Sequence, residues 1–409
     1  MRPQALNSVT AVSEAEWITL TGTADIDSDH RYLRFREHLE PGENLLITTR
    51  TTEGLRGAAH GAMSTPASGL ASNPWKLLGA PTALRLKEDD AEGAALRREH
   101  FAVALAAADR RSLDRDESIW EALTRGLGPC FTVRGFDRSE LILPPGVDGG
   151  ERERTSAALV SAIQHEAVLC GAGSVVFPFV APDERVLRGV LAECGFRSGV
   201  VTGVSQFTTK GCTSYDDYLA RLTSRRRSRY RHEEQELRDS SLSLAEVRLH
   251  DHVERIASLE AQTVAKHGGR PDPAIIARSR ALMARLMPDE VNVPAVADDD
   301  GNLIACGLHL LGGRSVLAMA YGCDYGVDER SMSYPWTCFY HPIRSAVRNG
   351  LESVRLGFEA FEAKVIRGAE IEVRETWVWL PNSAALNRLG SLLEFLHGRN
   401  TEYFAGLVG

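Results

Sequence analysis

The strongest constraint on the fold is the alternation of helix and strand signals in residues 151–196, which read ERERTSAALVSAIQHEAVLCGAGSVVFPFVAPDERVLRGVLAECGF. The pattern predicts an amphipathic helix, a glycine turn, a buried strand over 174–179 and a second helix that ends at a glycine. The GAG at 171–173 follows a helix and precedes a strand. It therefore indicates a helix C-cap rather than a phosphate loop, because phosphate-binding glycines open a helix.

The second half of the chain adds an antiparallel meander to this pattern. The meander consists of strands at 292–297, 303–311 and 315–324, joined by the turns DDDGN and GGR. The other predicted strands are 204–210, 242–250, 353–358 and 371–379, and the predicted helices are a short one from Ser214, then 224–238, 251–267, 273–287, 335–349 and 384–398. This order predicts an α/β fold with a mixed sheet.

Length and composition indicate an ordinary globular protein of two domains, since the chain has 409 residues, of which 43% are hydrophobic and 25% charged. We place the domains at 1–200 and 201–409. The net charge of −8 excludes nucleic-acid binding through bulk charge, so any polyanion must meet a local patch. No run of about 18 apolar residues and no signal-peptide core is found, and we expect a cytoplasmic protein without a membrane span.

One segment, LTSRRRSRYRHEEQEL at 222–237, concentrates positive charge in this acidic chain. Its arginines are Arg225, Arg226, Arg227, Arg229 and Arg231. Cations at the start of a helix and glutamates toward its end run against the helix dipole, which disfavours such an order by about 0.3–1 kcal/mol per charge. The segment therefore predicts a helix that contacts phosphates. The alternative is a solvated helix with intrahelical Arg–Glu pairs.

Lys364 is the second candidate, because the chain has only five lysines and 42 arginines. Where any cation would serve, this sequence uses arginine. An ammonium is a compact point charge that can stabilise one oxyanion or bind one phosphate, whereas a guanidinium favours planar, bidentate partners. Lys364 follows a predicted strand, where ligand crevices of α/β folds open. It is alternatively an exposed loop lysine. Nearby Arg367 is a candidate for donor binding.

Aromatic residues are dense in YGCDYGVDERSMSYPWTCFYHP at 321–342. Tyr321, Tyr334 and Trp336 are candidates for the lining of a substrate channel, where rings stack on bases or on a peptide. The alternative is that these rings belong to the hydrophobic core.

Seven scattered cysteines without a CxxC pair argue against a disulfide framework and against a zinc site. His250 and His252 would share one face of a strand, but no third metal ligand accompanies them. The DDDGN turn lacks the later glutamate of a calcium loop. We expect no metal and no cofactor other than the donor substrate.

The segments FTTKG, SYDDYLARLTSRRRSRYRHEEQEL, AMAYGCDYG and SYPWTCFYHPIRSAVRNGLESVRLGFEAFEAKVIRGAE follow one another in an order that resembles the second module of FemAB-like transferases and of BioF2-type acyltransferases, which have the GNAT fold. Residues 157–196 are similar to the end of their first module. The resemblance implies two tandem GNAT-like domains, each with a mixed, mostly antiparallel sheet flanked by helices. It also implies transfer of an acyl or aminoacyl group to an amine.

The resemblance implies site residues as well. The lysine of the Gly357–Lys364–Gly368 stretch would lie near the reacting carbonyl as the catalytic residue, and Arg225, Arg226 and Arg229 would lie near substrate phosphates. No side chain is identified as a general base.

The donor is inferred from a missing feature. Acetyl-CoA-dependent GNAT enzymes hold pyrophosphate with a glycine-rich turn that opens a helix, and the corresponding segment here, DERSMSYPWTCFYHP at 328–342, contains no glycine. We therefore expect aminoacyl-tRNA as donor and a small-molecule or peptide amine as acceptor, ahead of a cell-wall precursor. The alternatives are an acyl-CoA-dependent N-acyltransferase and a non-catalytic GNAT-like binding module. The oligomeric state is left open.

Overall fold

The computed structural model describes residues 2–22, 25–39, 44–64, 73–79, 126–327, 333–358 and 360–408. Contacts divide the chain into unit 1, formed by Met1–Gly22, Arg36–Gly203 and Glu372–Gly409, and unit 2, formed by Thr23–Phe35 and Val204–Ile371. The domain boundary at residue 200 stays a prediction. By contacts, however, the C-terminal residues 372–409 belong to unit 1.

Unit 1 contains a mixed, mostly antiparallel sheet. Its strands are β1 (Arg2–Leu6), β2 (Asn44–Thr51), β3 (Gly54–Ser64), β4 (Cys130–Val133), β5 (Ser174–Val180), most of β12 (Glu370–Trp379) and the first half of β6 (Arg197–Thr208), in the order β1-β2-β3-β4-β5-β12-β6. The β4–β5 pair is parallel, and β1–β2, β2–β3, β3–β4 and β5–β12 are antiparallel. Its helices are α1 (Glu14–Thr21), α3 (Pro74–Gly79), α6 (Gly149–Leu169), α7 (Arg185–Glu193) and α15 (Ser383–Val408), with the 3-10 helix η1 (Val9–Ala11); helix α2 (His30–Leu39) divides between the units.

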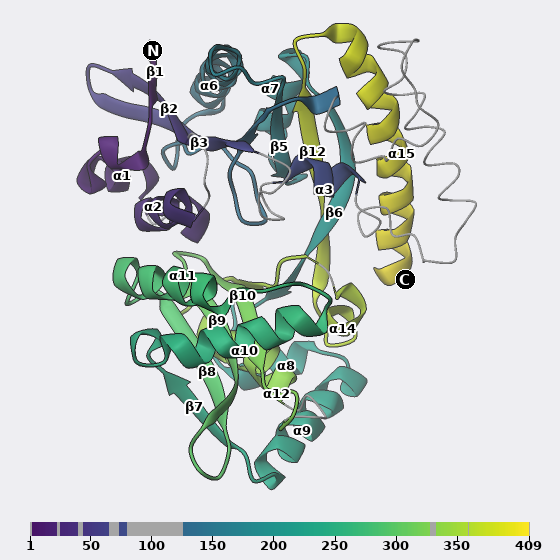
Figure 1. Cartoon of the computed structure of the whole chain (residues 1–409). Coiled ribbons are helices and arrows are strands. Elements are labelled where there is room, and N and C mark those ends of the chain that lie inside the picture. Colours follow the sequence, from purple (N-terminus) through teal and green to yellow (C-terminus); the bar gives the residue numbers. More distant parts are fainter. Residues whose placement is uncertain are drawn as a thin grey trace. The chain divides into compact units, whose positions relative to one another are not determined.

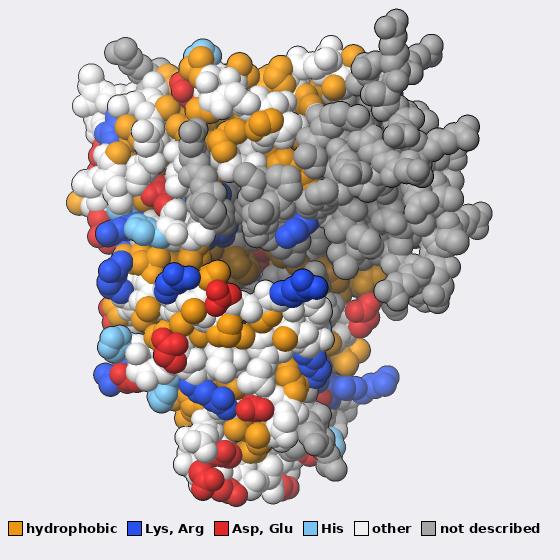
Figure 2. Space-filling model, viewed as in Figure 1, with side chains coloured by type: hydrophobic (Ala, Val, Ile, Leu, Met, Phe, Trp, Pro, Cys, Tyr) orange, Lys and Arg blue, Asp and Glu red, His pale blue; other side chains and the backbone are white. Residues whose placement is uncertain are grey.

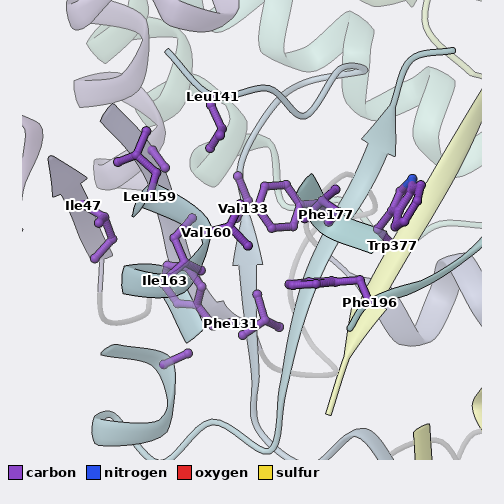
Figure 3. Close-up of a cluster of buried hydrophobic side chains, with 14 of the residues drawn as sticks. Ile47, Phe131, Val133, Leu141, Leu159, Val160, Ile163, Phe177, Phe196 and Trp377 are labelled. Atoms are coloured by element: carbon purple, nitrogen blue, oxygen red, sulfur yellow. The ribbon is translucent and has the colours of Figure 1, made fainter. Parts of the chain in front are cut away.

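Where α6 packs on the sheet, unit 1 contains a large cluster of hydrophobic side chains (Figure 3), and α6 also buries Thr155 and Ser156. Leu159 and Ile163 of α6 belong to one cluster with Phe131 of β4 and Phe177 of β5, and all four side chains are buried. The predicted helix–strand–helix pattern of 151–196 is confirmed as α6, β5 and α7. The glycine turn is confirmed too, because Gly171 has a φ of 77° directly after the helix.

Unit 2 has the strand order β6-β11-β10-β9-β8-β7. Its own strands are β7 (Ser243–Val247), β8 (Val291–Ala297), β9 (Leu303–Leu311), β10 (Ser315–Cys323) and β11 (Ser353–Arg355). The predicted meander is confirmed as antiparallel β8, β9 and β10, and β10 pairs in parallel with β11. The helices are α8 (Tyr215–Arg221), α9 (Ser224–Asp239), α10 (Val253–Lys266), α11 (Pro273–Leu286), α12 (Ser333–Pro335), the π-helix η6 (Trp336–Tyr340), α13 (His341–Arg348) and α14 (Phe361–Val365), with 3-10 helices η2 (Ile26–Ser28) and η5 (Leu249–Asp251).

Helices cover both faces of the unit 2 sheet. On one face, α10 and α11 lie across the strands (Figure 1), and α10 comes so close to β10 that a side chain at Gly322 would meet Leu259 and Glu260. On the opposite face, Gly307 of β9 lies close to the carbonyl of Thr337 in η6. Acidic, basic and hydrophobic side chains are interspersed over the α10–α11 face in Figure 2, so this view shows no patch of a single sign among the described residues there.

The helix predicted at 335–349 differs from the observed one in its first turn. The structure has the π-helix η6 followed by α13, and the His341 N–H donates to the carbonyl of Trp336. Pro342 explains the wider turn, because in an α-helix its ring would clash with the carbonyl four residues back and it has no N–H to donate. Wide turns of this kind occur often at functional sites.

Two further predictions need correction. His250 and His252 do not share a strand face, because β7 ends at Val247 and these residues lie in η5 and at its end. The terminal helix runs to residue 408, ten residues beyond the predicted end. Within the ranges given above, no helix is both long enough and apolar enough to cross a membrane.

Candidate active site

The Arg-rich helix is joined to its neighbour by two well-formed caps. Helix α8 opens with the predicted cap at Ser214, where Ser214 and Asp217 form a reciprocal capping box. Helix α9 begins after Thr223, whose hydroxyl accepts a hydrogen bond from the backbone N–H of Arg226. Thr223 and Ser214 are residue types that favour helix starts, so the local sequence explains both boundaries.

Two of the five clustered arginines serve the fold. Arg227 donates to the carbonyl oxygens of Leu219, Ala220 and Leu222 at 3.4, 3.2 and 2.9 Å, and so satisfies the open end of α8. Arg226 donates to the carbonyl oxygen of Val365 at 3.1 Å, which fastens α9 to α14. These contacts explain part of the positive charge at the start of α9 without any ligand.

The other three arginines of the cluster remain near solvent. Arg229 lies 3.7 Å from Glu233 one turn further on, and its side chain is 36% exposed. Arg225 and Arg231 are exposed, and neither forms a hydrogen bond or ion pair with another described residue. Arg226 thus contacts α14, Arg229 lies beside Glu233, and Arg225 is exposed.

Lys364 lies in α14 and is buried, so it is not an exposed loop lysine. Its Nζ donates to the backbone carbonyls of Leu356, Gly357 and Phe358 at 2.9, 3.4 and 2.9 Å. The loop that it holds contains Gly357 with a φ of 64° and leads to Ala360 with a φ of 45°. A left-handed alanine costs about 1–2 kcal/mol, so the surrounding contacts must hold this turn in place. The catalytic role of Lys364 stays a prediction.

Glu233 connects α9 to the turn after Lys364. The Arg367 guanidinium donates to both oxygens of Glu233, at 3.2 and 2.9 Å, and the Tyr340 hydroxyl of η6 donates to the same carboxylate. Burial alone would lower the pKa of Arg367, but the Glu233 carboxylate outweighs it and raises that pKa. Burial, with Glu233, also raises the pKa of Tyr340 and keeps the phenol protonated.

The three candidate aromatic residues are placed around η6. Tyr321 of β10 meets Tyr334 edge-on at 5.0 Å between ring centroids, and Tyr334 meets Phe339 in the same way at 5.1 Å. The ring of Trp336 lies apart from this pair, 5.8 Å from His341. Arg367 lies over Phe339 at 5.1 Å, so Tyr321 and Tyr334 join the Arg367 cluster through Phe339, whereas Trp336 does not.

Cys338, between these aromatic residues, is not an activated nucleophile. Burial raises the pKa of its thiol to about 12, although Lys364 and Arg367 act in the opposite direction. A protonated thiol is a weak nucleophile. The described residues include no group of three or more His, Cys, Asp or Glu side chains that could hold a metal ion.

A buried histidine cluster beneath η6 was missed by the sequence reasoning. His309 of β9 lies 6.3 Å from His341 of α13, and His341 contacts Glu246 at 3.0 Å. Burial, together with His341, lowers the pKa of His309 to about 3, against the opposing influence of the backbone at Thr337. The two histidines are 32 residues apart, and no motif links them. The Glu233–Arg367 pair was missed for the same reason.

Comparison with known proteins identifies relatives of this architecture. Residues 145–399, more than half of the chain, match the FemAB-like family, described as peptidoglycan biosynthesis/recognition. FemX superposes with a TM-score of 0.59 at 10% identity, covering 96% of this chain and 100% of FemX. A conserved protein of unknown function from Bacteroides thetaiotaomicron VPI-5482 superposes with a TM-score of 0.51 at 9% identity, covering 93% of this chain and 100% of that one.

A tandem GNAT protein from the clavulanic acid biosynthesis pathway is also similar, with a TM-score of 0.47, 11% identity and coverage of 93% and 99% of the two chains. No curated protein matches the chain by sequence. The fold is the predicted mixed α/β arrangement, and it is shared with FemX. The chain belongs to the FemAB-like family and is an enzyme of the acyltransferase type.

Proposed function

We propose that the chain transfers an aminoacyl group from aminoacyl-tRNA to an amine of a small-molecule or peptide acceptor. The observation that carries the proposal is the buried ammonium of Lys364 in α14, a helix that α9 contacts through Arg226 and that is followed by Arg367, the partner of Glu233. Membership of the FemAB-like family supports it, because members of that family use aminoacyl-tRNA donors.

The reaction needs little covalent chemistry from the protein. The acceptor amine attacks the ester carbonyl of the aminoacyl group, and a tetrahedral oxyanion forms. When this intermediate collapses, the ester C–O bond breaks, the amide remains, and the proton lost by the amine ends on the ribose hydroxyl. The protein supplies position, exclusion of water and positive charge for the oxyanion.

We assign the oxyanion to Lys364. Of the hydrogen bonds that its Nζ donates to Leu356, Gly357 and Phe358, the one to the Gly357 carbonyl is the longest, at 3.4 Å, and is the one that we expect the oxyanion to replace. Arg367 is fixed by Glu233 and Ala363, and its guanidinium adds positive charge beside the aromatic pair Tyr321 and Tyr334. In this scheme Lys364 is catalytic, and Arg367 with the two tyrosines binds the donor. Trp336 stays a predicted donor-binding residue, although its ring does not join the Arg367 cluster.

The donor phosphates would meet the outward face of α9. Arg225 is exposed and Arg229 is partly exposed beside Glu233, so these two members of the predicted set are accessible, whereas Arg226 acts through its bond to Val365. The absence of a glycine-rich turn supports this donor over acyl-CoA, and residues 328–332 of that segment lie outside the described residues. An acyl-CoA-dependent N-acyltransferase is the second candidate.

The proposal is tested with charged tRNA and hydroxylamine as a surrogate amine acceptor. We expect an enzyme-dependent rate of aminoacyl hydroxamate formation above the spontaneous rate, and the preferred amino acid identifies the donor. If the enzyme adds nothing with any charged tRNA but forms the acylated product from acyl-CoA, the donor assignment is wrong. If neither donor reacts although one binds, the chain is a binding module.

A further inference from the structure

We propose that a cavity between α8, α9 and α13 of unit 2 binds a phosphate group. The cavity has a volume of about 430 Å³, within the range of roughly 300–1,000 Å³ that is usual for small-molecule sites. Its cationic lining consists of Arg231, Arg238 and Arg344. None of these three arginines belongs to the proposed transfer site.

The cavity lies on the other edge of α9 from the Lys364 turn. Positions 231, 234, 235 and 238 recur at helical spacing and line the cavity, whereas Arg226 contacts Val365 of α14 and Glu233 contacts Arg367 beyond it. One helix therefore separates two differently built surfaces. The cavity can be tested without reference to the aminoacyl donor.

A buried carboxylate organises the arginines. Glu234 accepts hydrogen bonds from Arg344 at 2.7 Å and from the Tyr215 hydroxyl at 3.1 Å, and it lies 3.7 Å from Arg238. Arg344 also stacks on the Tyr215 ring with its Cζ 3.7 Å from the centroid. These contacts hold two guanidinium groups at the cavity wall before any ligand arrives, which lowers the entropy cost of binding.

The positive charge exceeds the negative charge in the cavity. Three arginines face two acids, Glu234 and Asp216, so the lining carries a net charge of +1. Arg231 is exposed and has no hydrogen-bond or ion-pair partner among the described residues, and the Nε of Arg344 is buried without a hydrogen-bond acceptor among them. The unused donors thus belong to groups on two different helices.

This arrangement favours phosphate over carboxylate. The guanidinium groups come from two helices, α9 and α13, so they reach a ligand from different sides. A tetrahedral phosphate offers several oxygens in different directions, whereas a carboxylate offers two oxygens in a single plane. The phosphate belongs either to a small phosphorylated molecule or to a nucleic-acid backbone, and the two sources share this chemistry.

The first test measures the affinity for ribose 5-phosphate by calorimetry. We expect saturable binding to the full chain and at least a tenfold weaker affinity in the Arg231→Gln, Arg238→Gln double variant. The matched control is Arg248→Gln, an exposed arginine of unit 2 outside the cavity. A short RNA that competes with ribose 5-phosphate assigns the site to a backbone phosphate, and failure to compete assigns it to a small molecule. If ribose 5-phosphate does not bind saturably, or if the control variant loses as much affinity as the double variant, the proposal is wrong.

The second test does not depend on how the variants fold. Arginines of the native chain are modified with phenylglyoxal with and without inorganic phosphate, and the modified positions are located by peptide mass spectrometry. We expect phosphate to protect Arg231 and Arg238 and to leave the exposed Arg248 unprotected. Equal protection of all three arginines would show non-specific binding and contradict the proposal.

Discussion

The buried regions under α6 in unit 1 and under η6 in unit 2 are built from different side chains. The first consists of aliphatic, phenylalanine and tryptophan residues around Phe131 and Phe177. The second contains the buried tyrosines Tyr218, Tyr230 and Tyr340 and lies beside ionic groups. Polar groups in a core require partners and add little net stability, so the concentration of tyrosines and ion pairs under η6 indicates a requirement beyond folding in that region.

The largest expected effect tests the hydrophobic side of this comparison. Phe177→Ala should lower the free energy of unfolding by about 3–5 kcal/mol, because a fully buried ring is removed and a cavity remains. Phe177→Leu keeps most of the volume and should cost less than about 1.5 kcal/mol. Denaturant unfolding measures both values. Equal, small losses would show that the α6 core is not tightly packed.

Lys364→Ala tests the functional side. We expect a fall in the hydroxylamine-dependent turnover of roughly 100-fold or more, with a smaller change in tRNA affinity, because the charge acts on the oxyanion. Lys210→Ala, which removes an exposed lysine paired with Glu352, is the matched control. A Lys364 variant that loses only donor affinity would remove this residue from the catalytic role.

Charge reversal on α9 should have an intermediate effect. The Arg225→Glu, Arg229→Glu double variant should bind tRNA at least tenfold more weakly. The slope of log K against log salt should become shallower by about 1.5–2 if both side chains contact phosphates. The control is the Arg270→Glu, Arg278→Glu double variant, which changes the net charge by the same amount. Both arginines are exposed; Arg270 precedes α11 and Arg278 lies in it. If this control weakens binding as much, the effect is one of net charge and not of α9.

The remaining prediction concerns the buried histidine, whose effect is spread over several pH units. The pKa of His309 is about 3 in the folded chain and about 6.5 when unfolded, so the unfolded state binds more protons between these values. The free energy of unfolding is therefore not reduced by this ring above pH 6.5, where it is neutral in both states. As the pH falls toward 3, the free energy of unfolding declines by at most about 1.4 kcal/mol per pH unit.

His309→Phe should therefore flatten the dependence of unfolding free energy on pH in this window. The difference between variant and parent at pH 7.5, where the ring is neutral in both states, reports the packing change alone. An unchanged slope from pH 6.5 to pH 4 would show that His309 does not titrate as its burial requires.

The sequence predicted the parts of the fold that depend on local pattern. The 151–196 unit, the meander and the Ser214 cap follow from periodicity, turn residues and capping chemistry, and each was confirmed. The π-turn was missed because helical periodicity does not distinguish it, although Pro342 was a visible signal. Contacts such as Glu233 with Arg367 join residues 134 positions apart, and no single-sequence pattern reports such a pair.

The opposite lesson comes from the arginine cluster. Residues 225–231 were considered together because of their charge, yet Arg227 closes α8 and Arg226 fastens α14. A cluster in sequence is therefore not a patch in space, because a helix distributes neighbouring residues around its axis.

The most direct test of the central claim is binding of total charged tRNA and of acetyl-CoA to the purified protein, measured side by side across a salt series. The account predicts tight tRNA binding that falls steeply with salt, and weak binding of acetyl-CoA. Sub-micromolar binding of acetyl-CoA without binding of tRNA would contradict it, and would make the chain a CoA-dependent acyltransferase.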